Sequence, residues 1–342
     1  MSNSNNSSIK WQDARLDLSQ KYTEPPIILK VDDSIVFTLG NFSASAGKEK
    51  SKKTFNVTAL TASLLSANPI LNYIPNPPAD RDKVLYVDTE QSNYHCYKVA
   101  SRIERLSKLR EDDFQERLIF LALRKFAPQS RIDIIEQAIY ANPDVFLVII
   151  DGLRDLVLDI NSPSESTEIM SKLLRWTDER NIHIHSVLHL NKGDDNTRGH
   201  LGTELNNKAE TILQITKSDI DSSSSIVSAK TVRDIEFDEF AFLINKDGLP
   251  ELLENYTSTN TEPFTYNELT DQEHRKALEL CFSTVTQQGY SELIENLQRA
   301  YRDAIGLDMG ISKTKRLKVF LSNKRMIIQK EKKYEFNPQY HF

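Results

Sequence analysis

The sequence of 342 residues contains only two cysteines, Cys96 and Cys281, which lie far apart and show no metal-ligand spacing. A disulfide framework or a cysteine-rich metal site is therefore not expected. Long apolar runs are also missing, since none approaches the roughly 20 residues that span a bilayer. The polar first residues lack the apolar core of a signal peptide. We therefore expect a cytoplasmic protein that does not bind membranes.

An excess of positive charge is absent too, because the formal net charge is −6. This balance argues against a basic coat for nucleic acid over the whole surface. The basic residues are nevertheless concentrated in one place, where residues 313–333 hold nine lysines and arginines against the single acid Glu331. Such asymmetry predicts a basic binding module attached to a more acidic one. The length suggests about two domains.

One glycine is missing from an otherwise recognisable phosphate loop. The pattern G-x-x-x-x-G-K-[ST] surrounds phosphates with backbone N–H groups, directs a lysine to the β- and γ-phosphates and places a hydroxyl on Mg²⁺. Lys52 stands where the second glycine is expected. The predicted nucleotide-binding residues are Gly47, Lys48, Glu49, Lys50, Ser51, Lys52, Lys53 and Thr54. The alternative is a lysine-rich surface turn.

The flanks of this loop favour the phosphate-loop interpretation. Residues 35–40 have β-branched and aromatic strand character, and residues 54–65 place apolar side chains at helical spacing without proline. A helix that begins at the loop offers unpaired N–H groups and a positive dipole end to an anion. We therefore expect a strand, the loop and a helix, in that order.

Three further segments have the continuous apolar character of buried parallel strands, namely residues 84–87, 145–150 and 182–188. Helical stretches lie between them, so the order is βαβα. Ligands of such sheets bind beyond the carboxyl ends of the strands. Each of the three strands is followed there by polar residues.

Asp151 follows the second of these strands, where phosphate-loop enzymes place the carboxylate that holds Mg²⁺. The metal prediction is therefore Thr54 and Asp151. The alternative for Asp151 is a turn residue, because Asp-Gly is a strong turn signal after any strand.

Glu90 follows the first strand and is predicted to orient and deprotonate the attacking water. Its alternative is a role at the start of a helix, where acidic residues are common. His189 and Lys192 follow the third strand and are predicted to sense or neutralise the γ-phosphate. A lone histidine is more often a core residue, but several strand ends that converge on one crevice favour a site.

In this order the motifs resemble the RecA-like ATPases: the phosphate loop, then Glu90, Asp151 and residues 189–192. They are most similar to the RepA-type hexameric helicases of plasmids and mobilizable elements, in which the catalytic glutamate follows the strand after the phosphate-loop helix. The resemblance covers residues 30–250. It implies an α/β fold, a RecA-like P-loop NTPase core whose mainly parallel sheet is flanked by helices, with ATP and Mg²⁺ as ligands and a homo-oligomeric, hexameric ring. Lys52 departs from the general pattern and bears on the rate of hydrolysis more than on the fold.

Two further features fit this resemblance. Lys230 and Arg233 lie where related ring ATPases place a Lys/Arg pair that reaches the neighbouring subunit's nucleotide, although the usual spacing is Lys-x-Arg. The alternative is an exposed strand with ordinary surface charges. Residues 192–202 correspond to a pore loop that contacts single-stranded DNA, and Lys192 and Arg198 are its predicted phosphate contacts. A flexible surface loop is the alternative there.

The basic region at the end of the chain resembles a winged helix-turn-helix. Residues 271–286, a second segment from Tyr290 and a third from Ser312 are predicted helices, and residues 327–336 form a predicted hairpin. In such domains the third helix enters the major groove and the hairpin touches the backbone. The predicted DNA contacts are Lys313, Lys315, Arg316, Lys318, Lys324 and Arg325. The alternative is the solvated face of a protein-interaction domain.

These features divide the chain into four parts. We predict a partly disordered arm over residues 1–29, an ATPase domain over 30–255, a linker over 256–265 and a small winged-helix domain over 266–342. The first hypothesis is a ring-forming DNA motor or helicase-like ATPase for the replication or mobilization of a plasmid or mobile element, with a primase or relaxase of the same element as a further partner. The second is an ATP-gated DNA-binding regulator that does not translocate, and a kinase is disfavoured by the basic tail.

Overall fold

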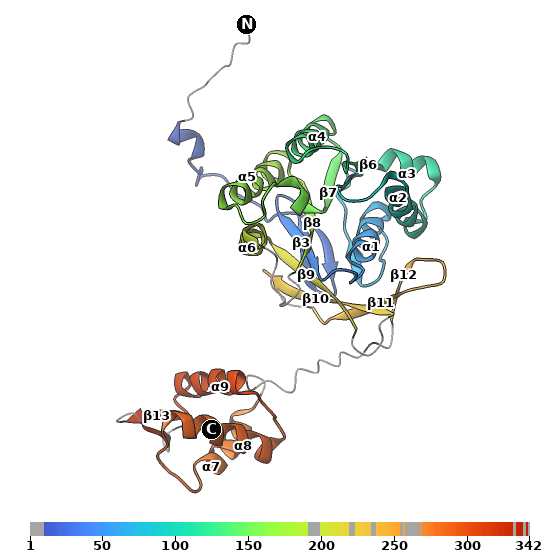
Figure 1. The fold of residues 1–342 in the computed structure, drawn as a ribbon. Coiled ribbons are helices and arrows are strands. Elements are labelled where there is room, and N and C mark those ends of the chain that lie inside the picture. Colours follow the sequence, from blue (N-terminus) through green and yellow to red (C-terminus); the bar gives the residue numbers. More distant parts are fainter. Residues whose placement is uncertain are drawn as a thin grey trace. The chain divides into compact units, whose positions relative to one another are not determined.

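The computed structural model describes residues 10–190, 199–218, 223–233, 237–253, 256, 266, 269–330, 333–337 and 340. The chain divides into two compact units, Met1–Tyr256 and Thr257–Phe342 (Figure 1). Each unit has its own hydrophobic core. None of the described helices is both long and apolar enough to cross a membrane.

The first unit is built on a nine-stranded sheet with the order β12-β11-β10-β9-β3-β8-β7-β5-β6. Six neighbouring strands are parallel: β9 (Thr211–Lys217), β3 (Phe42–Gly47), β8 (His183–His189), β7 (Val145–Asp151), β5 (Lys83–Asp88) and β6 (Leu118–Ala122). Three antiparallel strands extend the sheet beyond β9: β10 (Ser224–Val232), β11 (Phe240–Ile244) and β12 (Pro250–Leu252). The sheet is therefore mostly parallel, as the sequence predicts.

Helices cover both faces of this sheet (Figure 1). One face packs against α1 (Lys53–Ser66), α2 (Asn93–Ser107) and α3 (Glu111–Arg117). The other packs against α4 (Pro128–Ala141), α5 (Pro163–Arg180) and α6 (Gly199–Lys208). Alternate residues of a strand point to opposite faces of the sheet. Tyr86 packs in the first core, with α1–α3, and Val87 packs in the second core, with α4–α6.

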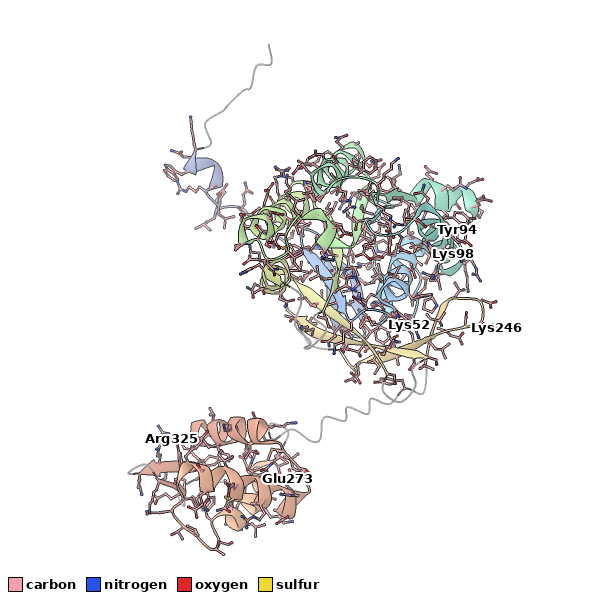
Figure 2. The ribbon with its side chains drawn as sticks, in the orientation of Figure 1. Lys52, Tyr94, Lys98, Lys246, Glu273 and Arg325 are labelled. Carbon is pink, nitrogen blue, oxygen red and sulfur yellow. The ribbon has the colours of Figure 1, made fainter. Side chains whose placement is uncertain are left out.

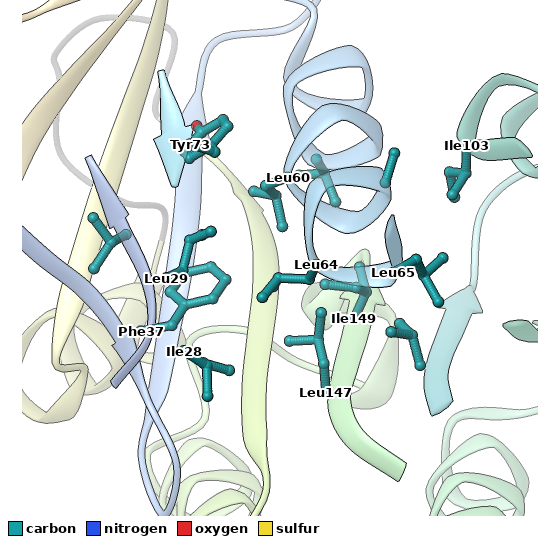
Figure 3. Close-up of a cluster of buried hydrophobic side chains, with 14 of the residues drawn as sticks. Ile28, Leu29, Phe37, Leu60, Leu64, Leu65, Tyr73, Ile103, Leu147 and Ile149 are labelled. Carbon is teal, nitrogen blue, oxygen red and sulfur yellow. The ribbon is translucent and has the colours of Figure 1, made fainter. Parts of the chain in front are cut away.

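A small antiparallel sheet of β2 (Ser34–Thr38), β1 (Ile27–Val31) and β4 (Tyr73–Pro75) adds to the first layer. Its Leu29 and Phe37 are fully buried in the same core as Leu60 and Leu64 of α1 (Figure 3). The phosphate-loop helix is thus enclosed on several sides, and even its Asn56 is buried, with an Oδ1 that accepts from the Tyr73 hydroxyl at 2.8 Å.

The strand that leads into the phosphate loop differs from the sequence prediction. Residues 35–40 were expected to play this part, but most of them form β2 in the small sheet, and β3 begins only at Phe42. The sequence of β3 is Phe-Ser-Ala-Ser-Ala-Gly, which lacks the β-branched residues that mark a strand. Its position between β8 and β9 determines its conformation instead, because strand propensity is subordinate to sheet context.

The small polar residues of β3 have a specific partner in β8. Ser43 Oγ lies 2.7 Å from both His183 Nε2 and His185 Nδ1, and Ser45 Oγ lies 2.8 Å from His185 Nε2. Burial lowers the pKa of His183 to about 3, so this imidazole is uncharged. Because His183 Nδ1 also lies 2.8 Å from the Thr38 carbonyl, that nitrogen holds the proton. The network fixes the strand that ends at Gly47 against the strand that ends at His189.

The second unit contains α7 (Asp271–Cys281), α8 (Tyr290–Ile305) and α9 (Ile311–Asn323), followed by a hairpin of β13 (Ile327–Lys330) and β14 (Lys333–Phe336). A capping box between Thr270 and Glu273 starts α7. The helix ends at Cys281, five residues before the predicted end. Gln288 explains the earlier end, because its side chain donates to the carbonyls of Cys281 and Val285 at 2.7 and 3.0 Å and holds an irregular turn there.

Two segment predictions concern residues only partly described. Most of the predicted linker 256–265 and residues 191–198 of the predicted pore loop lie outside the described residues. The end of that loop is helical rather than irregular, since α6 begins at Gly199. The reason is the apolar pair Leu201 and Leu205, one helical turn apart, which is buried in the second core.

Candidate nucleotide site

The phosphate-loop lysine is held inside its own loop. Lys53 is 5% exposed, and its Nζ donates to the carbonyl oxygens of Gly47 at 2.7 Å and Lys48 at 2.9 Å. Helix α1 begins at this residue with no side-chain cap and no acidic residue in its first turn. Its first N–H groups and positive dipole end therefore favour an anion.

Lys52 adopts the backbone conformation that the missing glycine would supply. Its φ of 66° and ψ of 29° are left-handed, and Lys50 has a φ of 63°. A non-glycine residue pays on the order of 1–2 kcal/mol for this conformation. The substitution therefore preserves the course of the loop at the expense of local strain. The side chain of Lys52, labelled in Figure 2, donates a hydrogen bond to the carbonyl of Ser223, just before β10.

Gly47 is required for steric reasons. A Cβ at this position would lie 2.3 Å from the Ile215 carbonyl oxygen and 2.6 Å from Ser51 Oγ. The first contact is with the backbone of the neighbouring strand β9, which cannot rotate away. The first glycine of the motif, Gly47, thus cannot be replaced by a residue with a Cβ unless the neighbouring strand moves.

Thr54 and Asp151 meet at the carboxyl end of the parallel sheet. Thr54 Oγ1 donates to Asp151 Oδ2 at 3.2 Å, and the Tyr86 hydroxyl donates to the same oxygen at 3.0 Å. The sequence predicts the first pair and misses Tyr86, which lies inside the apolar run of β5. The turn alternative for Asp151 does not account for these contacts, because both involve its side chain.

Glu90 and His189 also lie together, with Glu90 Oε1 3.6 Å from His189 Nε2. Asp88 supports the turn that presents Glu90, since its carboxylate accepts from the N–H groups of Glu90 and Gln91 at 3.0 and 2.8 Å. Asp88 thus accepts the backbone N–H groups of this turn, while Glu90 faces the site. Gly152, with a φ of 137°, leaves room for Glu90, because a Cβ there would lie 2.8 Å from Glu90 Oε1.

These groups share one cavity of about 470 Å³. Its walls include Lys53, Thr54, Glu90, Asp151 and His189, which the sequence assigns to the site. The cavity also has a wall that the sequence analysis missed. It comes from one face of α2 and the turn before it: Gln91, His95, Lys98 and Arg102.

The spacing of this wall, with steps of four, three and four residues, is that of one helix face. The sequence therefore shows these residues as one helix face, but it does not show that this face lines the site. Arg102 lies over the Phe55 ring, 3.7 Å from its centroid, and Lys98 lies 4.7 Å from the centroid of Tyr94 (Figure 2). The wall adds basic side chains to a site that already contains Lys53.

Buried carboxylates give the site an unusual charge balance. Burial raises the pKa of Asp151 to about 6, and the negative charge of Asp88 adds to this effect. Burial also lowers the pKa of Lys53 to about 8, against the attraction of Asp151 and Glu90. The pKa of Glu90 is instead lowered, chiefly by the close contact with His189 Nε2. Glu90 therefore stays ionised at neutral pH.

The donor set suits a magnesium ion that binds together with nucleotide. No cluster of three or more His, Cys, Asp or Glu side chains suited to a metal exists among the residues described. Mg²⁺ typically binds through one or two carboxylates and substrate phosphates. The Thr54 hydroxyl and the Asp151 carboxylate, 3.2 Å apart, fit this ion. The positive charge of a bound cation would lower the raised pKa of Asp151 again.

Other predicted site residues lie away from this cavity. Lys230 lies in β10, and the exposed Arg233 follows it; neither lines the cavity of its own chain. The pairing of β10 with β9 shifts between Ala229 and Thr231, which places a β-bulge at Lys230. Lys192 and Arg198 lie outside the described residues.

The predicted DNA contacts of the second unit are all on or beside α9. Lys313, Lys315, Arg316 and Lys318 belong to the helix, and Lys324 and Arg325 follow it on the surface (Figure 2). Lys315 is exposed, whereas the Lys318 ammonium lies 4.4 Å from the centroid of the Tyr334 ring. Lys318 thus already contacts an aromatic ring of its own unit, whereas Lys315 is exposed to solvent.

Comparison with known proteins identifies the first unit. A family model described as an AAA domain matches residues 15–195, more than half of the chain. The chain belongs to the AAA domain family. The match includes the phosphate loop, Glu90, Asp151 and His189. The mostly parallel sheet agrees with the RecA-like P-loop ATPase core expected from the sequence.

The crystal structure of the RadB recombinase is similar to part of this chain. The two share 17% sequence identity with a TM-score of 0.45, and the alignment covers 62% of this chain and 90% of that one. No curated protein matches the sequence.

Proposed function

We propose that this AAA-domain protein is an ATP-hydrolysing, ring-forming DNA motor of the RepA type, which acts in the replication or mobilization of a plasmid or mobile element. The observation that supports it most is the juxtaposition at the carboxyl edge of the sheet. There Thr54 contacts Asp151, and Glu90 contacts His189, in the cavity that also contains the phosphate-loop lysine.

The assigned roles follow from the positions of these groups. Lys53 would bind the β- and γ-phosphates at the first turn of α1, where the helix dipole also favours them. Thr54 and Asp151 would hold Mg²⁺, which neutralises charge on the phosphates when bound. The ion pair of Lys53 with the phosphates would keep this buried lysine protonated.

ATP hydrolysis needs a base that accepts a proton from the water molecule attacking the γ-phosphate. The water oxygen forms a bond to the γ-phosphorus, its proton passes to the Glu90 carboxylate, and the bond to the β-phosphate oxygen breaks to release ADP and phosphate. His189 keeps Glu90 ionised and oriented for this step. A positioned carboxylate of this kind contributes about 10²–10⁴-fold to the rate.

Lys230 and Arg233 would complete the site of a neighbouring subunit in a ring. Their absence from the cavity of their own chain is compatible with a role in trans. The bulge at Lys230 lies at the start of the Lys-x-x-Arg segment and interrupts the regular pairing of β10 with β9 there. An arginine supplied from a neighbour stabilises charge in the transition state by about 10³–10⁵ in rate.

The second unit supports a role on DNA. Three helices followed by a hairpin have the order of a winged helix-turn-helix, with the basic helix in third place. Lys315, Lys324 and Arg325 would supply phosphate contacts that depend on salt. We therefore assign the unit to duplex DNA.

A second function is an ATP-gated DNA-binding regulator in which nucleotide controls assembly without translocation. The observation in its favour is Lys52, a strained residue where phosphate loops have glycine. This substitution alters turnover more readily than binding, because the course of the loop is preserved.

ATP hydrolysis with and without DNA, measured on wild type and Glu90→Gln, separates the two functions. A motor should show turnover that DNA stimulates and that falls at least about 100-fold in Glu90→Gln, while ATP binding persists. Nucleotide-dependent DNA binding without turnover in wild type would support the regulator instead. Glu104→Gln, on the same helix layer but outside the cavity, is the matched control.

A further inference from the structure

Helix α2 presents aromatic and basic side chains on the side opposite its buried residues. Tyr94 and Tyr97 are 62% and 70% exposed, whereas Cys96, Val99 and Ile103 are buried. Residues at offsets of 3, 4, 7, 11 and 14 from Tyr94 follow one side of the helix. Together they form a surface that we call the α2 face: Tyr94, Tyr97, Lys98, Ser101, Arg105 and Lys108.

The α2 face is basic in a chain whose formal net charge is −6. Lys98, Arg105 and Lys108 are exposed, and Glu104, the only acid of α2, is half-buried at the border of the face. The Lys98 ammonium lies 4.7 Å from the centroid of the Tyr94 ring, so a cation and an aromatic ring occupy the same surface (Figure 2). This combination suits a ligand that carries both negative charge and flat rings.

We propose that the α2 face binds single-stranded DNA, with Tyr94 and Tyr97 stacked on bases and the cations in contact with phosphates. Aromatic rings beside cations are the means by which proteins hold single strands without sequence preference. The proposal rests on the DNA motor function proposed above, and it adds a surface distinct from residues 192–202 and from α9. From Tyr94 to Lys108 the chain rises about 21 Å, which corresponds to about six nucleotides at 3.4 Å each.

The chemistry of the face favours a single strand over other partners. Bases within a duplex are stacked on one another, so their flat faces are not accessible to a tyrosine. A protein partner is disfavoured because the α2 face contains no aliphatic side chain and two lysines. Lysine is depleted in the interfaces between proteins.

The α2 face adjoins the nucleotide site through the helix itself. Helix α2 begins at Asn93, three residues after Glu90, and its other flank lines the cavity with His95, Lys98 and Arg102. Lys98 thus belongs to both surfaces. A strand held on the α2 face would therefore act on the helix that follows Glu90.

Fluorescence anisotropy of the full chain tests this surface directly. A labelled single strand and the duplex of the same sequence are titrated with wild type, with Tyr94→Ala/Tyr97→Ala and with Tyr94→Phe/Tyr97→Phe. Both positions are exposed, so these substitutions leave the core intact. The phenylalanine variant is the matched control, because it keeps both rings and removes only the hydroxyls.

The alanine variant should bind the single strand at least about 10-fold more weakly than wild type, because stacking on the bases is lost. The phenylalanine variant should bind like wild type, and the affinity for duplex should change in neither variant. Unchanged affinity of the alanine variant for the single strand would overturn the proposal and leave the face to a protein partner. An equal loss on a strand without bases would overturn the stacking role.

Titration with a fluorescent ATP analogue in the absence of DNA separates the two kinds of ligand. The affinity should be the same for wild type and the alanine variant, because neither tyrosine is among the residues that line the cavity. A weaker affinity in the alanine variant would mean that the tyrosines hold the nucleotide, which would overturn the proposal. None of these titrations needs turnover. A wild type that binds single strands through the α2 face without ATP hydrolysis would refute the motor and not this surface.

Salt titration measures the phosphate contacts of the α2 face. Lys108→Gln should lower the dependence of log affinity for the single strand on log salt concentration by about 0.7 unit. Lys125→Gln is the control, since Lys125 is exposed after β6 and lies outside α2. Equal slopes for Lys108→Gln and the control would overturn the assignment of phosphate contacts to this face.

Discussion

The ammonium group of Lys52 donates a hydrogen bond to the carbonyl oxygen of Ser223, in the turn before β10. The residue that replaces a phosphate-loop glycine is therefore anchored to a neighbouring strand connection. The left-handed backbone of Lys52 keeps the loop in a shape that can surround phosphate, and the side chain compensates part of the strain. This relationship explains how the motif tolerates a lysine.

We expect Lys52→Gly to retain ATP binding and to change the free energy of unfolding by less than about 1 kcal/mol. The glycine relieves the left-handed strain but loses the hydrogen bond to Ser223. Lys52→Ala loses the bond and keeps the strain, so it should be the less stable of the two by about 1 kcal/mol. Urea unfolding and titration with a fluorescent nucleotide measure both effects. An alanine variant more stable than the glycine variant would contradict this account.

Gly47→Ala should destabilise the protein by about 1–3 kcal/mol, because its Cβ would press on the Ile215 carbonyl in β9. Urea unfolding measures the loss. Gly289→Ala is the control, since a Cβ there meets no atom within 4 Å and its φ is −69°. A similar effect of both substitutions would mean that the contact with Ile215 is relieved by a small movement of the strand.

Much of the site could be predicted because it depends on local patterns. Strong apolar runs located β5, β7 and β8, and the polar residues after them gave Glu90, Asp151 and His189. The strand β3 was missed because serine and alanine do not indicate a strand. They occur there because Ser43 and Ser45 pair with histidines of β8, a contact between residues about 140 positions apart.

The α2 wall of the cavity was missed for another reason. His95, Lys98 and Arg102 look like ordinary solvent-facing residues of an amphipathic helix. Only the position of α2 beside the phosphate loop turns that face towards the site. Tyr86 was missed because its hydroxyl is the one polar side-chain atom in the apolar run of residues 84–87, and its partner Asp151 lies on the adjacent strand β7.

Asp151→Asn should abolish ATP hydrolysis yet stabilise the ligand-free protein at pH 7.5. The pKa of Asp151 is raised from 3.8 to about 6, so ionisation of this half-buried carboxyl opposes folding. The folded state binds the proton more tightly, and stability is therefore lost as pH rises from about 4 to 6. Above that range the asparagine variant should be more stable by on the order of 3 kcal/mol.

Thermal unfolding at pH 4 and pH 7.5 tests this difference. The stabilisation should nearly vanish at pH 4, where Asp151 is protonated in the folded wild type. An asparagine variant that is less stable at pH 7.5 would show that the contacts with Thr54 and Tyr86 outweigh the buried charge.

His189→Asn should shift the acidic limb of the pH–rate profile to higher pH. The contact with His189 is the main cause of the lowered pKa of Glu90, so its removal raises that pKa and protonates the base at less acidic pH. The kcat for ATP hydrolysis, measured between pH 5 and 8, reveals the shift. A lower kcat with an unchanged pH–rate profile would mean that His189 acts through contacts with the γ-phosphate and not through the pKa of Glu90.

Lys315→Ala should weaken DNA binding and lower the salt dependence of the affinity by about one unit of slope, without a change in stability. Its side chain is exposed on α9. Lys318→Ala should instead reduce stability by about 0.5–1 kcal/mol, because its ammonium lies over the Tyr334 ring. Fluorescence anisotropy at several salt concentrations and urea unfolding separate the two outcomes. If Lys315→Ala leaves both affinity and salt slope unchanged, this face of α9 does not contact DNA, and the unit serves a protein partner instead.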